Sequence, residues 1–166
     1  MIDTSSLPTL GQGMVWQDLA VGQKFRTFRR TITETDLINF ISVTGMLEAI
    51  FIDADFPGKA MQGRAVPGAL TYCFIEGFIL QTMIQGTGLA MLELAQTIHA
   101  PVHVGDTIWA TVEVTDIRPT SKSDRAVVGS EIQVFSQDGR KVMTYLAKRL
   151  LAGRPADARA MQEQGQ

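Results

Sequence analysis

The chain has 166 residues, of which 45% are hydrophobic and 19% are charged, and its formal net charge at pH 7 is −2. This length fits one folded domain, and the absence of a basic surplus argues against a general nucleic-acid-binding protein. The single cysteine, Cys73, excludes an internal disulfide framework and a cysteine-based zinc site.

The ends of the chain lack the patterns of folded elements. Residues 1–15 hold no lysine or arginine, which a secretory signal peptide needs, so we expect a flexible leader there and a flexible tail at 153–166. A single domain is predicted between them, over residues 16–152. The longest apolar stretch, 65–84, is interrupted by proline, glycine and glutamate, which disfavours a membrane helix. We therefore expect a cytoplasmic protein without membrane contact.

The first half of the domain is predicted to be mainly helical. Alternating apolar and polar residues indicate one strand over residues 24–32. Thr33 and Asp36 form a capping-box pattern that predicts a helix start, and the apolar periodicity that follows ends at Gly45. Residues 46–62 show no period and are predicted to be irregular.

A long buried helix is predicted from Pro67, as its first helical residue, to about Gln85. The segment is apolar on nearly all sides, so protein should surround it. Within it, Cys73 is expected to be a buried, unreactive thiol. Glu76 would be costly there without a partner, and we expect it either to pair with an arginine or a dimer contact, or to point into a substrate tunnel.

The second half is predicted to be strands. Four segments rich in valine, isoleucine and threonine are separated by short turn signals, at residues 89–100, 107–117, 126–135 and 141–151. The connections are too short for crossover helices, so the sheet should be antiparallel. An α+β fold in which the sheet curls around the long helix, the hot-dog architecture, follows as the economical arrangement. Its open strand edges favour a homodimer or a higher homo-oligomer.

Four segments of the chain resemble MaoC-like dehydratases, in the same order along the sequence. They are residues 16–25 (WQDLAVGQKF), 30–36 (RTITETD) with Phe40, 63–71 (GRAVPGALT) and 100–107 (APVHVGDT). The resemblance covers most of the predicted domain. It implies the hot-dog fold and a place near the (R)-specific enoyl-CoA hydratases, which add water across the double bond of an acyl thioester. No cofactor is expected beyond the coenzyme A or acyl-carrier-protein thioester itself.

The resemblance also implies a catalytic sequence motif, which this chain lacks. Family members carry Asp-x-Asn-Pro-x-His after the first helix, and its aspartate and histidine form the acid/base pair. Here Met46 stands at the aspartate position, Glu48 at the asparagine and Phe51 at the histidine. Neither methionine nor phenylalanine can carry a proton, so the family's catalytic pair is expected to be replaced.

The remaining candidate for proton chemistry is Glu48. A carboxyl in an apolar pocket has a raised pKa suited to acid/base catalysis, although a solvated loop carboxylate is the alternative. Asp53, which lies beyond the motif, is expected only to shape the loop.

A thioester site is predicted at the start of the long helix. The backbone N–H groups of Gly68 and Ala69 lie at the positive end of its dipole and could face a thioester oxygen. Substrate-binding residues are expected around them, namely Met46, Phe51, Arg64, Val66 and Pro67. Arg64 either meets a phosphate of coenzyme A or is an ordinary surface arginine.

His99 and His103 are the only histidines. On a strand their side chains would lie roughly 13 Å apart, too far to share a metal ion, so no metal site is expected.

Three functions stay open at this point. The first is an enoyl-CoA hydratase or dehydratase, a lyase, with a degenerate active site. The second is a non-catalytic acyl-CoA-binding protein, or a structural subunit beside a catalytic partner chain. The third is a hot-dog thioesterase that uses Glu48 or Glu76.

Overall fold

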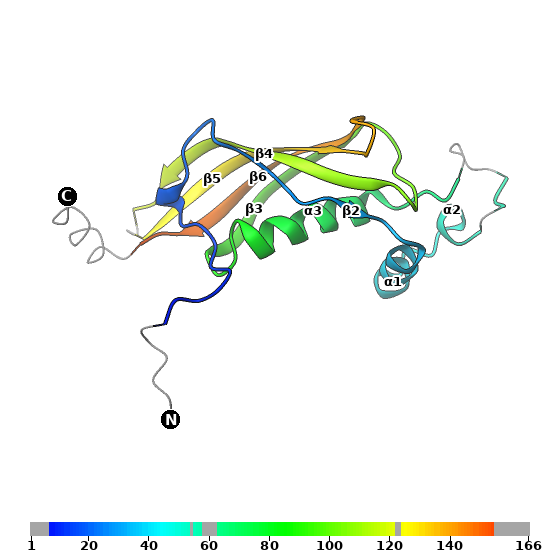
Figure 1. The fold of residues 1–166 in the computed structure, drawn as a ribbon, viewed down its shortest axis with the longest axis horizontal. Coiled ribbons are helices and arrows are strands. Elements are labelled where there is room, and N and C mark those ends of the chain that lie inside the picture. The colour runs from blue at the N-terminus through cyan, green and yellow to red at the C-terminus, as the bar shows by residue number, and fades with distance from the viewer. Residues whose placement is uncertain (1–6, 54, 58–62, 122–123, 155–166) are drawn as a thin grey trace, which may run out of the picture.

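An antiparallel sheet curls around one long helix, α3 (Gly68–Thr82), as Figure 1 shows. The structure, a computed structural model, describes residues 7–53, 55–57, 63–121 and 124–154. Pro67 was expected to be the first helical residue of α3. It lies instead at the N-cap, one position before the helix begins. The prediction of a single long helix against an antiparallel sheet is confirmed.

Four long strands form most of the sheet. They are β3 (Gly88–Ile98), β4 (Thr107–Pro119), β5 (Arg125–Phe135) and β6 (Lys141–Ala152). The strand order is β1-β4-β5-β6-β3, and every pairing is antiparallel. The edge strand β3 pairs only with β6 among the described residues, and all of its residues are exposed.

The strand expected over residues 24–32 is interrupted. It divides into β1 (Lys24–Arg26) and β2 (Arg30–Thr31), which both pair with β4. The Thr27 hydroxyl accepts a hydrogen bond from the N–H of Ala110 at 2.8 Å and donates to the carbonyl of Phe28 at 2.8 Å. A side chain thus takes the place of a backbone acceptor at this point, and the ladder breaks.

Helix α1 (Glu34–Thr44) begins and ends where the sequence predicts. The Thr33 hydroxyl accepts from the N–H of Asp36 at 3.2 Å, and the Asp36 carboxylate accepts from the N–H of Thr33 at 2.9 Å. Gly45 ends the helix with φ of 72°, a left-handed conformation that glycine adopts without strain.

A short helix, α2 (Ala49–Ile52), lies in the segment that was expected to be irregular. Glu48 caps it by accepting from the N–H of Ile50 at 2.9 Å. Figure 1 shows α1 and α2 together at one end of the molecule, beyond the start of α3.

The core lies between α3 and the concave face of the sheet. Alternate residues of β6 are buried there, including Met143, Tyr145 and Leu151, and they face buried α3 residues such as Ile75 and Ile79. The expectation that α3 is enclosed on all sides is wrong for one face, because Cys73 and Leu80 are exposed. That face looks away from the core of the single chain.

The chain before η1 (Trp16–Asp18) is attached to the rest of the fold. The N–H groups of Gly13 and Met14 donate to the carbonyls of Gln85 and Met83 at 2.7 and 2.8 Å. The remainder of the expected leader and tail includes residues 1–6 and 155–166, which lie outside the described residues. Within the described chain, no helix is both long and apolar enough to cross a membrane.

Candidate functional site

Two distant segments hold the start of α3 in place. The N–H of Val66 donates to the carbonyl of Val102 at 2.9 Å, and the N–H of Val104 donates to the carbonyl of Arg64 at 2.9 Å. Ala65 and His103 form the antiparallel bridge between them. Residues 63–71 and 100–107, two of the segments that carry the family resemblance, therefore bind each other directly before Pro67.

A third resembling segment joins this arrangement. The N–H of Gly105 donates to the carbonyl of Ile32 at 2.8 Å, and the N–H of Ile32 donates to the carbonyl of Asp106 at 2.9 Å. The Asp106 carboxylate also accepts from the N–H of His103 at 2.9 Å. The segments that lead into α1 and α3 are thus both hydrogen-bonded to the turn around Gly105.

The first turn of α3 offers two free donors. The N–H groups of Leu70 and Thr71 donate to the carbonyl of Pro67 at 2.9 and 3.4 Å. Those of Gly68 and Ala69 donate to no acceptor within the described residues. Because the helix dipole makes this end positive, both groups are suited to an oxygen that carries negative charge.

Gly68 packs closely against the Ile98 side chain. A Cβ atom at this position would lie 2.4 Å from Cδ1 of Ile98 on β3. A larger residue would therefore require the Ile98 side chain to move, so the glycine lets this side chain pack directly against the helix start.

A cavity of about 350 Å³ opens at this helix start. The predicted residues Phe51, Val66 and Gly68 line it, together with Thr71, Ile98, His99 and further residues. The Thr71 side chain is 2% exposed, and its hydroxyl has no hydrogen-bond partner among the described residues. A buried hydroxyl without a partner is unfavourable, which makes Thr71 a candidate to bind a ligand in this cavity.

Five predicted site residues are not part of the cavity lining, namely Met46, Glu48, Arg64, Pro67 and Ala69. Glu48 is exposed, and its carboxylate caps α2 instead of facing an apolar pocket. Met46 is 40% exposed and does not line the cavity. The acid/base role of Glu48 stays a prediction without geometric support in the single chain.

Arg64 connects three parts of the site. Its guanidinium bonds the Glu34 carboxylate of α1, with Nη2 at 2.8 Å and Nε at 3.0 Å, and also donates to the carbonyl of Phe51 in α2. Arg64 therefore holds both small helices against the entry to α3. Binding of a coenzyme A phosphate by Arg64 stays a prediction.

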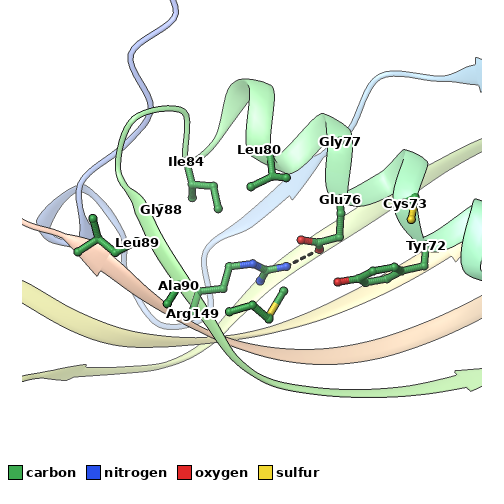
Figure 2. A pocket seen from close by; sticks show the side chains of 11 residues that line it. Tyr72, Cys73, Glu76, Gly77, Leu80, Ile84, Gly88, Leu89, Ala90 and Arg149 are labelled. Carbon is green, nitrogen blue, oxygen red and sulfur yellow. Dashed lines mark hydrogen bonds and ion pairs between the residues drawn. The ribbon is translucent and has the colours of Figure 1, made fainter. Parts of the chain in front are cut away.

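A second cavity, of about 460 Å³, lies farther along α3, between this helix and the start of β3 (Figure 2). Glu76 and Arg149 point toward one another at this cavity and form an ion pair, and their side chains are 9% and 7% exposed. The Tyr145 hydroxyl donates to the same Glu76 oxygen at 2.7 Å. The expectation that Glu76 pairs with an arginine is confirmed.

The partners of Glu76 were missed, although a signal for Arg149 was present. Arg149 continues the buried alternation of β6 that runs through Tyr145 and Ala147. A charged residue in a buried register position, opposite a glutamate in an apolar helix, indicates an internal ion pair.

Glu76 also affects two titratable neighbours. Burial and the negative charge of Glu76 raise the pKa of the Tyr72 hydroxyl and of the Cys73 thiol. Cys73 is exposed, contrary to the prediction of a buried thiol, because it lies on the uncovered face of α3. The raised pKa still disfavours the reactive thiolate.

Each histidine has a polar neighbour, and His99 also lines the helix-start cavity. The His99 Nε2 lies 2.9 Å from the Thr144 hydroxyl, and the His103 Nδ1 lies 3.8 Å from the Asp106 carboxylate. Across the described ranges, no three histidine, cysteine or acidic side chains group so that they could hold a metal ion.

Known proteins share this fold and its sequence features. The chain is 24% identical over 123 residues to 3-hydroxybutyryl-CoA dehydratase of Methylorubrum extorquens, an alignment that covers 72% of this chain and 78% of the relative. The unliganded R-hydratase PhaJ1 of Pseudomonas aeruginosa matches the structure with a TM-score of 0.72 and 27% identity, over 87% of this chain and 88% of that chain.

The hot-dog architecture has a direct match. Rv0216 of Mycobacterium tuberculosis, described as a double hot-dog fold, matches with a TM-score of 0.77 and 20% identity, over 87% of this chain and 46% of that chain. The predicted hot-dog fold is confirmed.

A family model also matches residues 19–145, which run from before β1 into β6 and include all the residues that line the helix-start cavity. The model describes the FAS1-like dehydratase domain region. The chain therefore belongs to the family of FAS1-like dehydratase regions, which fits its resemblance to the MaoC-like dehydratases.

Proposed function

We propose that this protein binds an acyl thioester at the start of α3 and acts on it as an enoyl-CoA hydratase or dehydratase with a degenerate active site. The observation that carries the proposal is the pair of free N–H groups of Gly68 and Ala69 at the start of α3, where Gly68 lines the cavity of about 350 Å³. Two fixed donors at a helix start stabilise the oxygen of an enolate-like thioester intermediate.

The relatives support this substrate class and reaction. One is named as a 3-hydroxybutyryl-CoA dehydratase and another as an R-hydratase. Both names describe addition or removal of water, the first names an acyl-CoA, and this chain has the same fold as the R-hydratase.

A non-catalytic acyl-CoA-binding protein is the second candidate. Phe51, at the expected histidine position, lines the cavity with an apolar ring, and the Glu48 carboxylate is engaged in capping α2. A thioesterase has less support, since Glu76, the carboxylate on α3, is paired with Arg149.

We further propose that the protein works as a homodimer through the β3 edge. Leu89, Leu92 and Ile98 of this strand are 45%, 54% and 55% exposed. Exposed apolar edge strands favour pairing with another strand, and Rv0216 carries two hot-dog units in one chain. A second copy would also cover the free face of α3.

Calorimetric titration with butyryl-CoA, together with a crotonyl-CoA hydration assay, tests the proposal. We expect saturable butyryl-CoA binding and a hydration rate about 10²–10⁴-fold below that of an intact family member, because the acid/base pair is missing. No binding would contradict the thioester site, and full turnover would contradict the degenerate active site.

Two pairs of variants, each with a matched control, test whether Thr71 binds the ligand and whether Glu48 supports turnover. Thr71→Val should weaken butyryl-CoA binding about fivefold or more, since it removes the buried hydroxyl that we propose bonds the ligand. Thr87→Val removes an equally buried, unpartnered hydroxyl at the far end of α3 and should leave binding unchanged. Glu48→Gln should abolish any residual turnover, whereas Glu93→Gln should not. Residual turnover that survives Glu48→Gln would contradict the acid/base role of Glu48, and the absence of any turnover in the wild type would favour the binding protein.

A further inference from the structure

The two cavities lie along the same side of α3. Residues of α3, β3 and β6 line both of them, with Ile98 and Met143 at the helix start and Met91 and Arg149 farther along. Glu76 follows Gly68 by eight residues, which is about 12 Å along a helix. An acyl group held at the helix start that extends along α3 therefore heads toward the second cavity.

Two tyrosines contact each other beside the second cavity. Tyr72 and Tyr145 contact edge to face, with ring centroids 5.2 Å apart. Tyr72 also lines the second cavity, as Figure 2 shows. An acyl chain that passes Tyr72 next meets the Glu76–Arg149 pair.

The polar groups in this cavity have unused hydrogen-bonding capacity. Tyr145 and Arg149 both bond Oε1 of Glu76, whereas Oε2 accepts no hydrogen bond from a described residue. The Nε of Arg149 is buried and has no partner among the described residues. Both charged side chains are more than nine-tenths buried.

The remaining walls are largely apolar, with Leu80, Ile84, Leu89 and Met91 among them. An alkyl chain would pack well against these side chains but would separate the Glu76 and Arg149 groups from water. Burying such groups without a hydrogen bond is unfavourable. A hydroxyl at the end of the chain removes this penalty, because it can donate to the carboxylate and accept from the guanidinium.

We propose that the Glu76–Arg149 pair selects the distal end of the acyl group, so that the second cavity accepts a chain ending in a hydroxyl and disfavours an unbroken hydrocarbon chain. This proposal rests on the proposed thioester site at the start of α3. It deepens that function by naming the chemistry of the acyl group.

The test compares two ligands of equal length on the wild-type protein. Calorimetry would measure the dissociation constants of dodecanoyl-CoA and ω-hydroxydodecanoyl-CoA, with butyryl-CoA as the ligand too short to reach the pair. We expect the hydroxylated chain to bind about fivefold more tightly or better than the unbroken chain, which corresponds to one unsatisfied polar group. Equal affinity, or tighter binding of dodecanoyl-CoA, would overturn the proposal without the need for any variant.

The second part of the test replaces Glu76, Tyr145 and Arg149 by apolar residues. The triple variant Glu76→Met, Tyr145→Phe, Arg149→Met removes all three polar groups together, which buried ion clusters often tolerate. Dodecanoyl-CoA should now bind the more tightly of the two long ligands. An unchanged preference for the hydroxylated chain in this variant would assign that preference to other groups and overturn the proposal.

Glu93 and Lys148 supply the matched control. They form an exposed ion pair at 2.7 Å between β3 and β6, and Lys148 directly precedes Arg149 in the sequence. The variant Glu93→Met, Lys148→Met should keep the wild-type preference. Failure of the wild type to bind butyryl-CoA would instead overturn the thioester site, so the two proposals fail by different results.

Discussion

Lys148 and Arg149 are neighbours on β6, and each pairs with a glutamate, but their surroundings differ. The Lys148–Glu93 pair is exposed, with side chains 48% and 60% accessible. The Arg149–Glu76 pair is enclosed between α3 and the sheet, where it also holds the Tyr145 hydroxyl. Because successive residues of a strand face opposite sides of a sheet, one step along the chain separates a solvated charge pair from an internal one.

This contrast shows that the environment decides the consequence of a charge pair. Water screens the outer pair and weakens the attraction between its charges. The inner pair has lost water, so each charge depends on its partner. Breaking each pair in turn measures the difference.

The largest effect is expected for Arg149→Met. It leaves the Glu76 carboxylate buried without its cation, and loss of one partner of a buried pair lowers the free energy of unfolding by about 3–5 kcal/mol. Urea unfolding followed by circular dichroism would measure this change. A loss similar to that of Lys148→Met would show that water reaches Glu76.

Tyr145→Phe should have an intermediate effect. It removes one neutral donor to the carboxylate but leaves Arg149 in place, and a hydrogen bond to a charged group contributes about 1.5–3 kcal/mol. The same unfolding experiment applies. Tyr72→Phe is the control, since Tyr72 contacts Tyr145 through its ring.

The Arg30–Asp36 pair lies between the two extremes, with side chains 45% and 16% exposed and a separation of 2.6 Å. Burial opposes ionisation of Asp36, but hydrogen bonds from Thr33 and the charge of Arg30 outweigh it and lower the pKa of this carboxyl below 3.8. A lowered folded-state pKa stabilises the fold above the unfolded-state value and loses this contribution as pH falls through the folded-state value. Wild-type stability should therefore decline below about pH 3.8 more steeply than that of Asp36→Asn. Parallel declines would show that Asp36 titrates alike in both states.

The smallest effect is expected for Lys148→Met. Exposed pairs contribute about 1 kcal/mol or less to the free energy of unfolding, and salt screens this contribution. Urea unfolding at low and high salt should show a difference from the wild type that shrinks as salt rises. A large difference that salt does not alter would place this pair in a drier environment than its exposure indicates.

Features that depend on neighbouring residues could be predicted from the sequence. The capping box of α1 and its end at Gly45 rest on side chains within one turn. The four long strands follow from their β-branched residues and short turns, and the long helix follows from its apolar length. The family resemblance then indicated the cavity-lining residues Phe51, Val66 and Gly68.

Features that depend on distant contacts could not be predicted in this way. Helix α2 has only four residues and no period, and it is held by the Glu48 cap and by Arg64 from beyond the loop. The exposure of Cys73 depends on which face of α3 the sheet leaves uncovered. Nothing in the sequence distinguishes Thr71 from other helix residues. Its hydroxyl stands out only in the structure, where it is buried in the first turn of α3 without a partner among the described residues.

The backbone hydrogen bonds that hold the segment before Pro67 affect how the site forms during folding. Residues 64–66 bond to residues 102–104, and Ile32 bonds to Gly105 and Asp106, so the entry to α3 joins segments that are far apart in the sequence. Contacts of such separation form slowly because a long loop must close first. The amide protons of Ile32, Val66 and Val104 should therefore gain protection from hydrogen exchange together, later than those within α1, and their common opening rate would report how often the site comes apart.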